Sequence, residues 1–525
     1  MATTTIREIT MKHLGLGVSR RSFLGGLGML GGEGLLNVPR TTAGSTFQTP
    51  EAIAEEIVID LAGGPDNLDP ALARSTRDWS VIHSVYDSLL LLSNDGELVP
   101  LAAESFEAVD DTTYDVVLRL GLRFHDGTPV TSSAIERGIA HVQASEGPAA
   151  ANFGVVERVE IVDELSARII TREPAAWLPS QIAVWFVLFP EDATPESLAR
   201  TPVGSGPYRF EKLEAGTEVV LGRNPDYTWP SPKGMPLAET ARFRFVPEPA
   251  TRVADLGTGG ANIVTSIPND QLRAVEEAGG DVIETAILGT VFLRLTTDVA
   301  PFDDPRVGIA LNHAVDVDAL TGSLVSGESH RLASIFPDQR SIGFDRELAP
   351  FAYDPARARA LLDEAGIAPG LSMRLEFAGG ERDDILQVIV AQLGEVGINV
   401  TLESLELAAF NGSWQDPKSA PLRFVSWRPV FDPHTLLSLM FASGGPLSRH
   451  RDDLADELIR SGAVEPAPDA RAAVYRELGR RFQEVPPAIF LWNLTSTYGV
   501  KDVLGAWSPR GDEYVIPTKV TEDAR

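Results

Sequence analysis

The adjacent pair His125-Asp126 is the first place where the sequence carries two side chains that could exchange a proton, as a catalytic acid–base pair does. The pair lies at a predicted tight turn. Apolar side chains occupy alternate positions from Leu118 to Phe124, which predicts a strand before the turn, and Thr131 or Ser132 can cap a helix after it. This setting favours a structural hydrogen bond for His125 over catalysis.

No other pattern in the sequence favours an enzyme. The chain has no HExxH, no GxSxG elbow and no Walker loop, and its eight histidines lie far apart without the spacing of metal ligands. The absence of cysteine excludes disulfides, thiolate catalysis, cysteine-bound zinc and iron–sulfur clusters. Gly26, Gly28 and Gly31 satisfy GxGxxG, but no strand precedes them, so we reject a dinucleotide site. We expect a protein that is not an enzyme and that holds no metal and no cofactor.

Length and charge narrow the class of protein further. The chain has 525 residues, 43% of them hydrophobic, which predicts two or three domains. A formal net charge of -29 disfavours nucleic acid and anionic membrane surfaces as partners, because the field of the protein would repel both. The best apolar run, Ala175 to Pro190, is interrupted by Gln181 and by proline, and it predicts buried structure rather than a membrane span.

The N-terminus is typical of an export signal. Arg20-Arg21 precedes a weakly apolar segment, Gly25 to Gly32, as in a twin-arginine signal peptide. Cleavage is placed near Thr42-Ala43-Gly44 or near Ala52-Ile53-Ala54, and Met11 is an alternative start. We predict that residues 1–54 are a signal and linker, and the lack of cysteine leaves no site for a lipid at an N-terminal cysteine.

Several later elements have strong local signals. The sequence predicts a strand at Glu56–Leu61, a helix at Trp79–Leu92 and a long β-rich stretch at Val282–Thr297. The segment Pro202–Phe210, PVGSGPYRF, predicts a tight chain crossing, because its glycines permit conformations that other residues resist. The clearest helix is YDPARARALLDEAG, residues 353–366, with aspartate as its cap, proline in its first turn and glycine at its end.

The amino-acid motifs in these segments are more specific than the secondary structure that they predict. It resembles the peptide/nickel class, family 5, of the extracytoplasmic solute-binding proteins of ABC importers. The resemblance covers residues 56 to about 500 through ordered motifs. They are Leu68-Asp69-Pro70, VYDSL at 85–89, DGELVPLA at 95–102, LRLGLRFHDGTPVT at 118–131, PVGSGPYRF at 202–210, PFDDPRV at 301–307 and YDPARARALLDEAG at 353–366.

The resemblance implies a fold and a mechanism. The fold is α/β, a bilobal periplasmic-binding-protein fold (type II, cluster C) with an additional small domain. The lobes would close around a solute, and a permease would recognise the closed form. The implied domains are lobe I at 55–95, 205–290 and 490–525, a small α+β domain at 96–204, and lobe II at 291–489.

The resemblance also points to a candidate ligand site after Trp427. Peptide-binding members carry a carboxylate there that pairs with the α-ammonium of the peptide, but this chain reads WRPVFDP, one residue shorter and without an acid at the usual place. Asp432 either replaces that acid or caps a helix that begins at Pro433, and Arg428 would suit an anion instead. Further candidate contacts are Trp427, Phe431, Trp414 and Trp492, with Asn493 and Tyr86 as weaker candidates.

We therefore expect an exported, monomeric, non-lipidated solute-binding protein in a periplasm. Its expected partners are a peptide-like or other small polar solute and the subunits of an ABC permease. Two alternatives remain open, an exported enzyme or cofactor protein and a ligand sensor for a membrane receptor.

Overall fold

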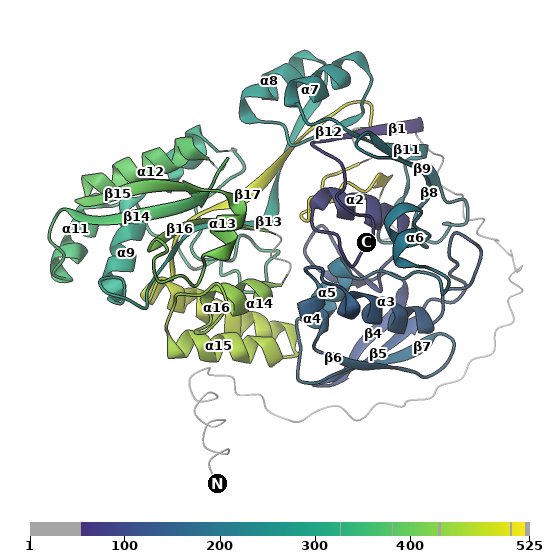
Figure 1. Ribbon diagram of the computed structural model, residues 1–525, viewed down its shortest axis with the longest axis horizontal. Helices are drawn as coiled ribbons and strands as arrows, with labels where there is room; N and C mark the ends of the chain where they lie inside the picture. The colour runs from purple at the N-terminus through teal and green to yellow at the C-terminus, as the bar shows by residue number, and fades with distance from the viewer. Residues whose placement is uncertain (1–53, 326, 381, 429–431, 504–506, 520–525) are drawn as a thin grey trace, which may run out of the picture. The chain divides into compact units, whose positions relative to one another are not determined.

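The computed structural model describes residues 54–325, 327–380, 382–428, 432–503 and 507–519 (Figure 1). The predicted export segment therefore lies outside the described residues except for Ala54, and so does the candidate contact Phe431. All of the described residues belong to one compact unit, Pro50–Arg525.

Ten strands form one mixed sheet that organises the chain. Their order is β15-β14-β16-β13-β17-β12-β1-β11-β9-β8. The predicted strand at Glu56–Leu61 is confirmed as β1, which pairs in parallel with β11 on one side and β12 on the other. The strands are β1 (Ala54–Leu61), β8 (Tyr208–Glu214), β9 (Glu218–Arg223), β11 (Ala238–Phe245), β12 (Ile263–Thr265), β13 (Asp281–Leu295), β14 (Leu371–Ala378), β15 (Ile398–Leu405), β16 (Leu422–Trp427) and β17 (Ala488–Val500).

Two long strands join the halves of this sheet. The antiparallel strands β13 and β17 pair along most of their lengths, and β13 corresponds to the long β-rich stretch predicted at Val282–Thr297. The C-terminal end of β17 pairs with β12, whereas the C-terminal half of β13 pairs with β16. Figure 1 shows the two strands running between the two halves of the sheet. Their register shifts between Ala286 and Thr290 and again between Thr290 and Phe292. A bulge weakens the ladder locally, so this is the point where the sheet can bend most easily.

A separate antiparallel sheet has the order β4-β5-β7-β6. Its strands are β4 (Ala103–Asp110), β5 (Thr113–Leu118), β6 (Val156–Ile161) and β7 (Ser166–Thr171), and the last two form a hairpin. Two short pairs complete the strands, β2 (Leu90–Leu92) with β3 (Leu98–Pro100) and β10 (Met235–Pro236) with β18 (Thr518–Lys519). The domain boundaries implied by the resemblance remain a prediction.

Helices pack against the sheets, and both contribute to the buried apolar clusters. The α-helices are α2 (Thr76–Val85), α3 (Ser133–Ala144), α4 (Ala150–Phe153), α5 (Leu178–Trp185), α6 (Pro195–Arg200), α7 (Pro249–Thr258), α8 (Leu272–Glu277), α9 (Pro305–Ala314), α10 (Val317–Ser323), α11 (Pro355–Glu364), α12 (Asp383–Glu395), α13 (Leu407–Gly412), α14 (Pro433–Leu436), α15 (Asp453–Val464) and α16 (Pro468–Glu484). A 3₁₀ turn, η1 (Asn269–Gln271), and a π-helical turn, η2 (Leu437–Phe441), precede α8 and follow α14.

The predicted start of α11 is confirmed, whereas two other element boundaries are wrong. Asp354 accepts a hydrogen bond from the N–H of Arg357 and caps α11. The strand expected at Leu118–Phe124 ends at Leu118, because Leu120 is 85% exposed and offers no buried face. The helix expected at Trp79–Leu92 ends at Val85, and its last apolar residues instead form β2.

The predicted chain crossing is confirmed at Gly204 and Gly206. A Cβ on Gly204 would lie 2.1 Å from the carbonyl oxygen of Val85, and one on Gly206 would lie 2.7 Å from it. The His125 ring fixes the same crossing: Nδ1 accepts from the N–H of Gly204 at 3.3 Å, and Nε2 donates to the carbonyl of Gly206 at 3.1 Å. His125 is therefore structural, as the turn position predicted.

The buried apolar side chains form four clusters. The first reaches from β1 through the four-stranded sheet and includes residues near the C-terminus, among them Val500, Trp507 and Ile516. The second surrounds β14, β16, α9, α11 and α12, and the third packs around α14, α15 and α16. A small fourth cluster lies under α7 and α8. Residues from the first and third clusters approach each other around the cavity described next.

Candidate functional site

A cavity of about 650 Å³ is lined by segments that lie far apart in the sequence. One wall is the start of α2, from Arg74 to Trp79, with Tyr514 beside it. A second wall comes from the segment at 148–152 and from α5. The third runs from Trp427 at the end of β16 to Leu439 in η2. The cavity is therefore lined by the start of α2, by α4 and α5, and by residues between the end of β16 and η2.

Three arginine side chains line this cavity, namely Arg74, Arg77 and Arg428. Arg428 pairs with Glu513 at 3.1 Å, and Arg77 donates from Nε to the carbonyl oxygen of Gly64 at 3.2 Å. Within the described chain, neither Arg74 nor Arg77 has a carboxylate partner. They flank the N-terminus of α2, where the Asp78 carboxylate, which does not line the cavity, accepts from the N–H groups of Asp66, Arg74 and Ser75. This wall of the cavity is cationic.

Asp432 lines the same cavity, but its charge is already compensated. Its two oxygens bind the Arg471 guanidinium at 2.5 and 2.8 Å, and Ser180 donates to it at 3.3 Å. Burial alone would raise the pKa of Asp432, but the charge and hydrogen bonds of Arg471 outweigh it and lower that pKa. The carboxylate also accepts from the N–H of His434, so the helix-capping interpretation is observed. Contact with a solute remains a prediction.

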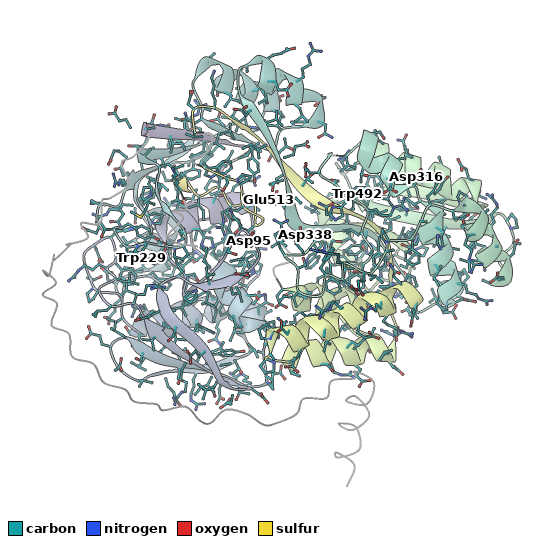
Figure 2. The ribbon with its side chains drawn as sticks, turned by 180° about the vertical axis from the view of Figure 1, so that it is seen from behind. Asp95, Trp229, Asp316, Asp338, Trp492 and Glu513 are labelled. Atoms are coloured by element: carbon teal, nitrogen blue, oxygen red, sulfur yellow. The ribbon has the colours of Figure 1, made fainter. Side chains whose placement is uncertain are left out.

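The structure brings some of the other predicted residues together and separates the rest. Trp427 and Arg428 line the cavity with Asp432. Trp492 is 3% exposed on β17 (Figure 2) and packs in the second core, and Trp414 packs against the Arg423 guanidinium, 4.1 Å from its ring centroid. Asn493 is buried and its side-chain oxygen accepts from the N–H of His330 at 2.7 Å. These three do not line this cavity, and their contact with a solute stays a prediction.

Sequence reasoning missed most of the cavity's walls. Arg74, Arg77 and Trp79 belong to the loop and first turn of α2, and Gln181 and Trp185 belong to α5. One local signal was available for the first group: Ser75 and Asp78 form a capping box, which fixes the helix start and hence the position of the flanking arginines. No local signal marked α5 as part of the site.

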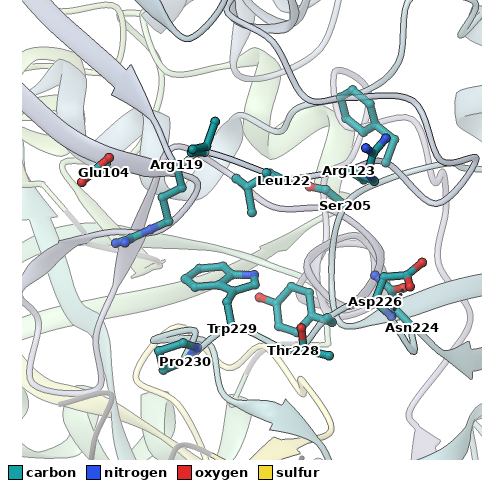
Figure 3. Close-up of a pocket in the computed structure, with 14 residues that line it drawn as sticks. Glu104, Arg119, Leu122, Arg123, Ser205, Asn224, Asp226, Thr228, Trp229 and Pro230 are labelled. Carbon is teal, nitrogen blue, oxygen red and sulfur yellow. Dashed lines mark hydrogen bonds between the residues drawn. The ribbon is translucent and has the colours of Figure 1, made fainter. Parts of the chain in front are cut away.

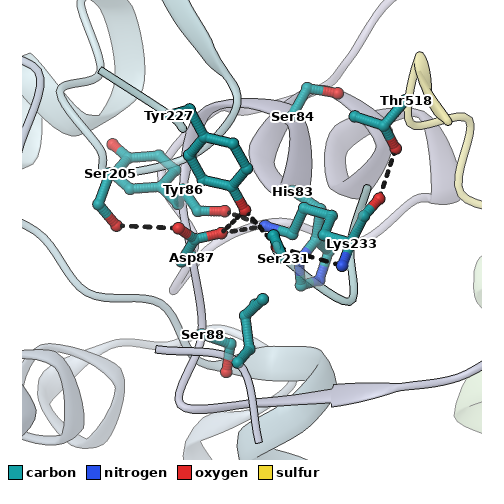
Figure 4. A network of polar contacts seen from close by, with 12 residues as sticks. His83, Ser84, Tyr86, Asp87, Ser88, Ser205, Tyr227, Ser231, Lys233 and Thr518 are labelled. Atoms are coloured by element: carbon teal, nitrogen blue, oxygen red, sulfur yellow. Dashed lines mark hydrogen bonds and ion pairs between the residues drawn. The ribbon is translucent and has the colours of Figure 1, made fainter. Parts of the chain in front are cut away.

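Tyr86, the other weak candidate, belongs to a buried polar network beside the chain crossing (Figure 4). Lys233 donates to Asp87 at 2.6 Å and to the carbonyl oxygen of Tyr86 at 2.6 Å, and Tyr227 donates to Asp87 at 3.3 Å. Burial raises the pKa of Asp87 and lowers that of Lys233, against the mutual attraction of the pair. The network is fully enclosed, so we assign it to the fold and not to a ligand.

A second cavity, of about 440 Å³, adjoins this network, because Tyr227 and Ser205 are among its lining residues (Figure 3). It is lined by the segment at 119–124 and the loop at 224–230, with the Arg119 guanidinium 5.2 Å from the ring centroid of Trp229. None of the predicted site residues lines it.

Two further properties bear on the class of protein. Among the described residues, no group of three or more histidine and acidic side chains is arranged to hold a metal ion. No helix in the described part of the chain has the length and apolarity needed to cross a membrane.

The mixed α/β architecture is that of the bilobal periplasmic binding proteins, and the comparisons identify the family. A family model described as bacterial extracellular solute-binding proteins, family 5 Middle, matches residues 97–447. The chain belongs to this family, and it is a substrate-binding protein of an ABC transporter.

Individual relatives agree with this assignment. The chain is 28% identical to a glutathione-binding protein GsiB of Pectobacterium atrosepticum over 369 residues, which is 68% of this chain and 71% of the relative. Among solved structures, HbpA2 of Haemophilus parasuis is similar with a TM-score of 0.78 at 21% identity, covering 87% of this chain and 98% of that one. NikA of Brucella suis in complex with Fe(III)-EDTA has a TM-score of 0.76 at 25% identity, covering 88% and 98%. The first of these structures supports the fold alone.

Proposed function

We propose that the 650 Å³ cavity is the solute site of this binding protein and that it takes a peptide-like or other small polar solute for delivery to an ABC permease. One observation carries the proposal: the cavity draws polar side chains from α2, from α5 and from the β16–α14 segment, which belong to different hydrophobic clusters. A solute that contacts all three segments gains binding energy only when they are together, so it stabilises the closed arrangement.

The two long strands supply the connection that such closure needs. Strands β13 and β17 pass from one half of the sheet to the other, and their pairing is interrupted between Ala286 and Thr290. Bending at a few strand residues allows two packed cores to move as rigid bodies. A permease can then distinguish the loaded protein from the empty one by the arrangement of its two halves.

The choice of solute class rests on the cavity and on the relatives. Trp79, Trp185 and Trp427 offer flat apolar surfaces, and Asn152 and Gln181 offer amide groups, a combination that suits a small organic solute with polar substituents. The relatives at 25–28% identity over most of their length are named as glutathione-binding proteins, which supports a peptide-like solute for this chain.

The location and assembly of the protein are part of the same proposal. We place the exported chain in a periplasm, without a lipid anchor, as a monomer that turns over no substrate. The family description as extracellular proteins, the Arg20-Arg21 segment and the absence of cysteine support export without a lipidated cysteine.

Native mass spectrometry of the protein from its host's periplasm tests the proposal. We expect one small organic molecule per chain, which denaturation releases for identification. Replacement of Gln181 by leucine should reduce its occupancy, because the cavity loses an amide contact, whereas Gln339→Leu, outside the cavity, should not. A tightly held metal or cofactor together with turnover of a substrate would instead support an exported enzyme.

A further inference from the structure

The charges that line the proposed solute cavity differ sharply from those of the whole chain. The chain has a formal net charge of -29. Arg74, Arg77 and Arg428 nevertheless line the cavity, and Asp432 is the one carboxylate among its described lining residues. Because Arg471 binds both oxygens of Asp432, that carboxylate contributes little net negative potential. A cationic cavity in an acidic protein indicates selection for an anion, since the overall field works against one.

A buried hydrogen-bond donor lines the same cavity. Trp79 is 1% exposed, and its Nε1–H has no partner among the described residues. An indole N–H can only donate, and a buried donor without an acceptor is costly. An oxygen of a bound solute would satisfy it. The Trp79 donor therefore requires the same type of atom that the guanidinium groups require.

The third arginine, Arg428, lies between two cavities. Arg428 lines both the main cavity and a smaller one of about 110 Å³, where it meets Glu513 at 3.1 Å. Its side chain is 51% exposed, whereas that of Glu513 is 12% exposed and also accepts from Ser496. Glu513 is thus held by two partners, and the more exposed Arg428 can share its charge with a second anion in the main cavity.

We infer that the solute carries an anionic group, a carboxylate or a phosphate, and that Arg74, Arg77 and Arg428 select it. This inference rests on the proposed function of the cavity and specifies the chemistry of its solute. Guanidinium groups suit both anions, because their planar N–H pairs match two oxygens of either group. The anion lies at the arginine wall, with one oxygen accepting from Trp79, while the remainder of the solute contacts the aromatic and amide surfaces.

The test uses the mature full-length protein and three kinds of probe. The two dipeptide sets have the same side chains, and the third probe is a single phosphorylated compound. N-acetyl dipeptides carry a carboxylate and no ammonium, the corresponding dipeptide amides carry an ammonium and no carboxylate, and N-acetylphosphoserine amide carries a phosphate alone. We expect thermal-shift and calorimetric binding with the first set, the third probe, or both, and none with the amides. The carboxylate and phosphate arms distinguish the two sources of negative charge.

Single variants assign the selection to the named residues. Arg77→Gln and Arg428→Gln should each weaken binding of the best anionic probe at least about 10-fold, whereas Arg460→Gln, an exposed site on α15 with the same change of charge, should leave it within about 2-fold. Glu513→Gln removes the carboxylate that competes for Arg428 and should tighten binding about 3-fold or more. A purely structural role for the pair would not tighten binding.

Two outcomes would overturn the inference. In one, dipeptide amides bind as well as the N-acetyl dipeptides, or no anionic probe binds. In the other, the arginine variants bind like Arg460→Gln. Either result leaves the binding function itself to be judged separately, because a solute released from the host-purified protein identifies a binding protein whatever its charge.

Discussion

Asp432 and Arg471 form an ion pair, and its contribution to the stability of the fold depends on how deeply it is buried. The side chains are 0% and 5% exposed, the contact is bidentate, and the pKa of Arg471 rises because the attraction of Asp432 outweighs its desolvation. Burying a charge costs desolvation free energy, and the attraction between the two buried charges offsets that cost only while both are present. The pair therefore acts as a structural unit beside the cavity.

Removing one partner should reveal this dependence. Asp432→Ala leaves the Arg471 guanidinium buried and uncompensated, so we expect the free energy of unfolding to fall by about 3–5 kcal/mol in urea denaturation. Asp115→Ala is the matched control, since its pair with Arg168 is 45% and 40% exposed and should contribute less than about 1 kcal/mol. Equal effects of the two substitutions would contradict the assignment.

His125 should make the fold sensitive to acid. Burial is the main cause that lowers the pKa of this imidazole to about 4, from an ordinary value near 6.5. Between these values the unfolded state binds more protons than the folded state, so stability falls as the pH drops from about 6.5 toward 4. At pH 5 this one group should reduce the free energy of unfolding by about 2 kcal/mol relative to neutral pH.

The measurement is the urea midpoint at pH 7 and pH 5 for the native chain and for His125→Gln. The variant loses the ring contacts with Gly204 and Gly206, so it should be less stable at both pH values. Its loss between the two pH values should nevertheless be smaller, because it lacks the titrating ring. An unchanged pH response would assign the acid sensitivity to other buried histidines, such as His450.

At the scale of elements, the chain crossing at residues 202–210 depends on close contact with the end of α2. Gly204→Ala places a Cβ 2.1 Å from the carbonyl oxygen of Val85, an atom that cannot move without disturbing the helix end. We expect the free energy of unfolding to fall by at least about 3 kcal/mol, or folding to fail.

A second glycine gives the opposite result and serves as the control. Gly394 lies in α12, where a Cβ meets no atom within 4 Å. Gly394→Ala should therefore stabilise the protein by about 0.5–1 kcal/mol, through reduced backbone freedom in the unfolded chain. Thermal unfolding of both variants checks the pair, and a destabilised Gly394→Ala would contradict the explanation.

Elements with complete local signals could be predicted from the sequence, and elements decided by burial could not. Asp354, Pro355 and Gly366 fix both ends of α11 without help from the rest of the fold. The alternation from Leu118 to Phe124 mimics a strand, but sequence alone does not reveal that Leu120 points into solvent. The apolar residues after Val85 continue a helical pattern, yet pairing with β3 converts Leu90–Leu92 into a strand.

The candidate site is assembled from segments that lie far apart in the chain, which explains why only part of it was predicted. Trp427, Arg428 and Asp432 follow one another in the chain, and a single motif found them. Arg77, Gln181 and Tyr514 reach the same cavity from positions separated by hundreds of residues. Only the folded topology shows that these segments meet.

Contacts across the cavity's edge offer a further test at the scale of the whole molecule. The Trp177 and His434 rings stack with centroids 4.8 Å apart, and the N–H of Ala176 donates to the carbonyl of Ala463 at 3.0 Å. If these contacts stabilise the closed form, His434→Leu should weaken binding of the co-purified solute about 2- to 10-fold, the equivalent of a stacked pair worth about 0.5–1.5 kcal/mol.

The loss should appear mainly as faster solute dissociation, which stopped-flow fluorescence measures. His313→Leu is the control, because its ring packs against Phe351, with centroids 5.4 Å apart, and takes no part in the Trp177–His434 stack. Equal affinities for the native chain and the His434 variant would show that the stack does not contribute to closure.

The position of the C-terminal segment has a consequence for the order of events during synthesis. Val503, Trp507 and Ile516 pack in the same cluster as Ile57 and Trp79, from the first strand and helix of the described chain. The earliest core therefore cannot close until the chain has been synthesised through Ile516. Until then the growing chain exposes apolar surface that chaperones can bind, and a product cut short before residue 503 keeps that surface permanently exposed. Synthesis of Val503, Trp507 and Ile516 thus controls when the earliest core can close.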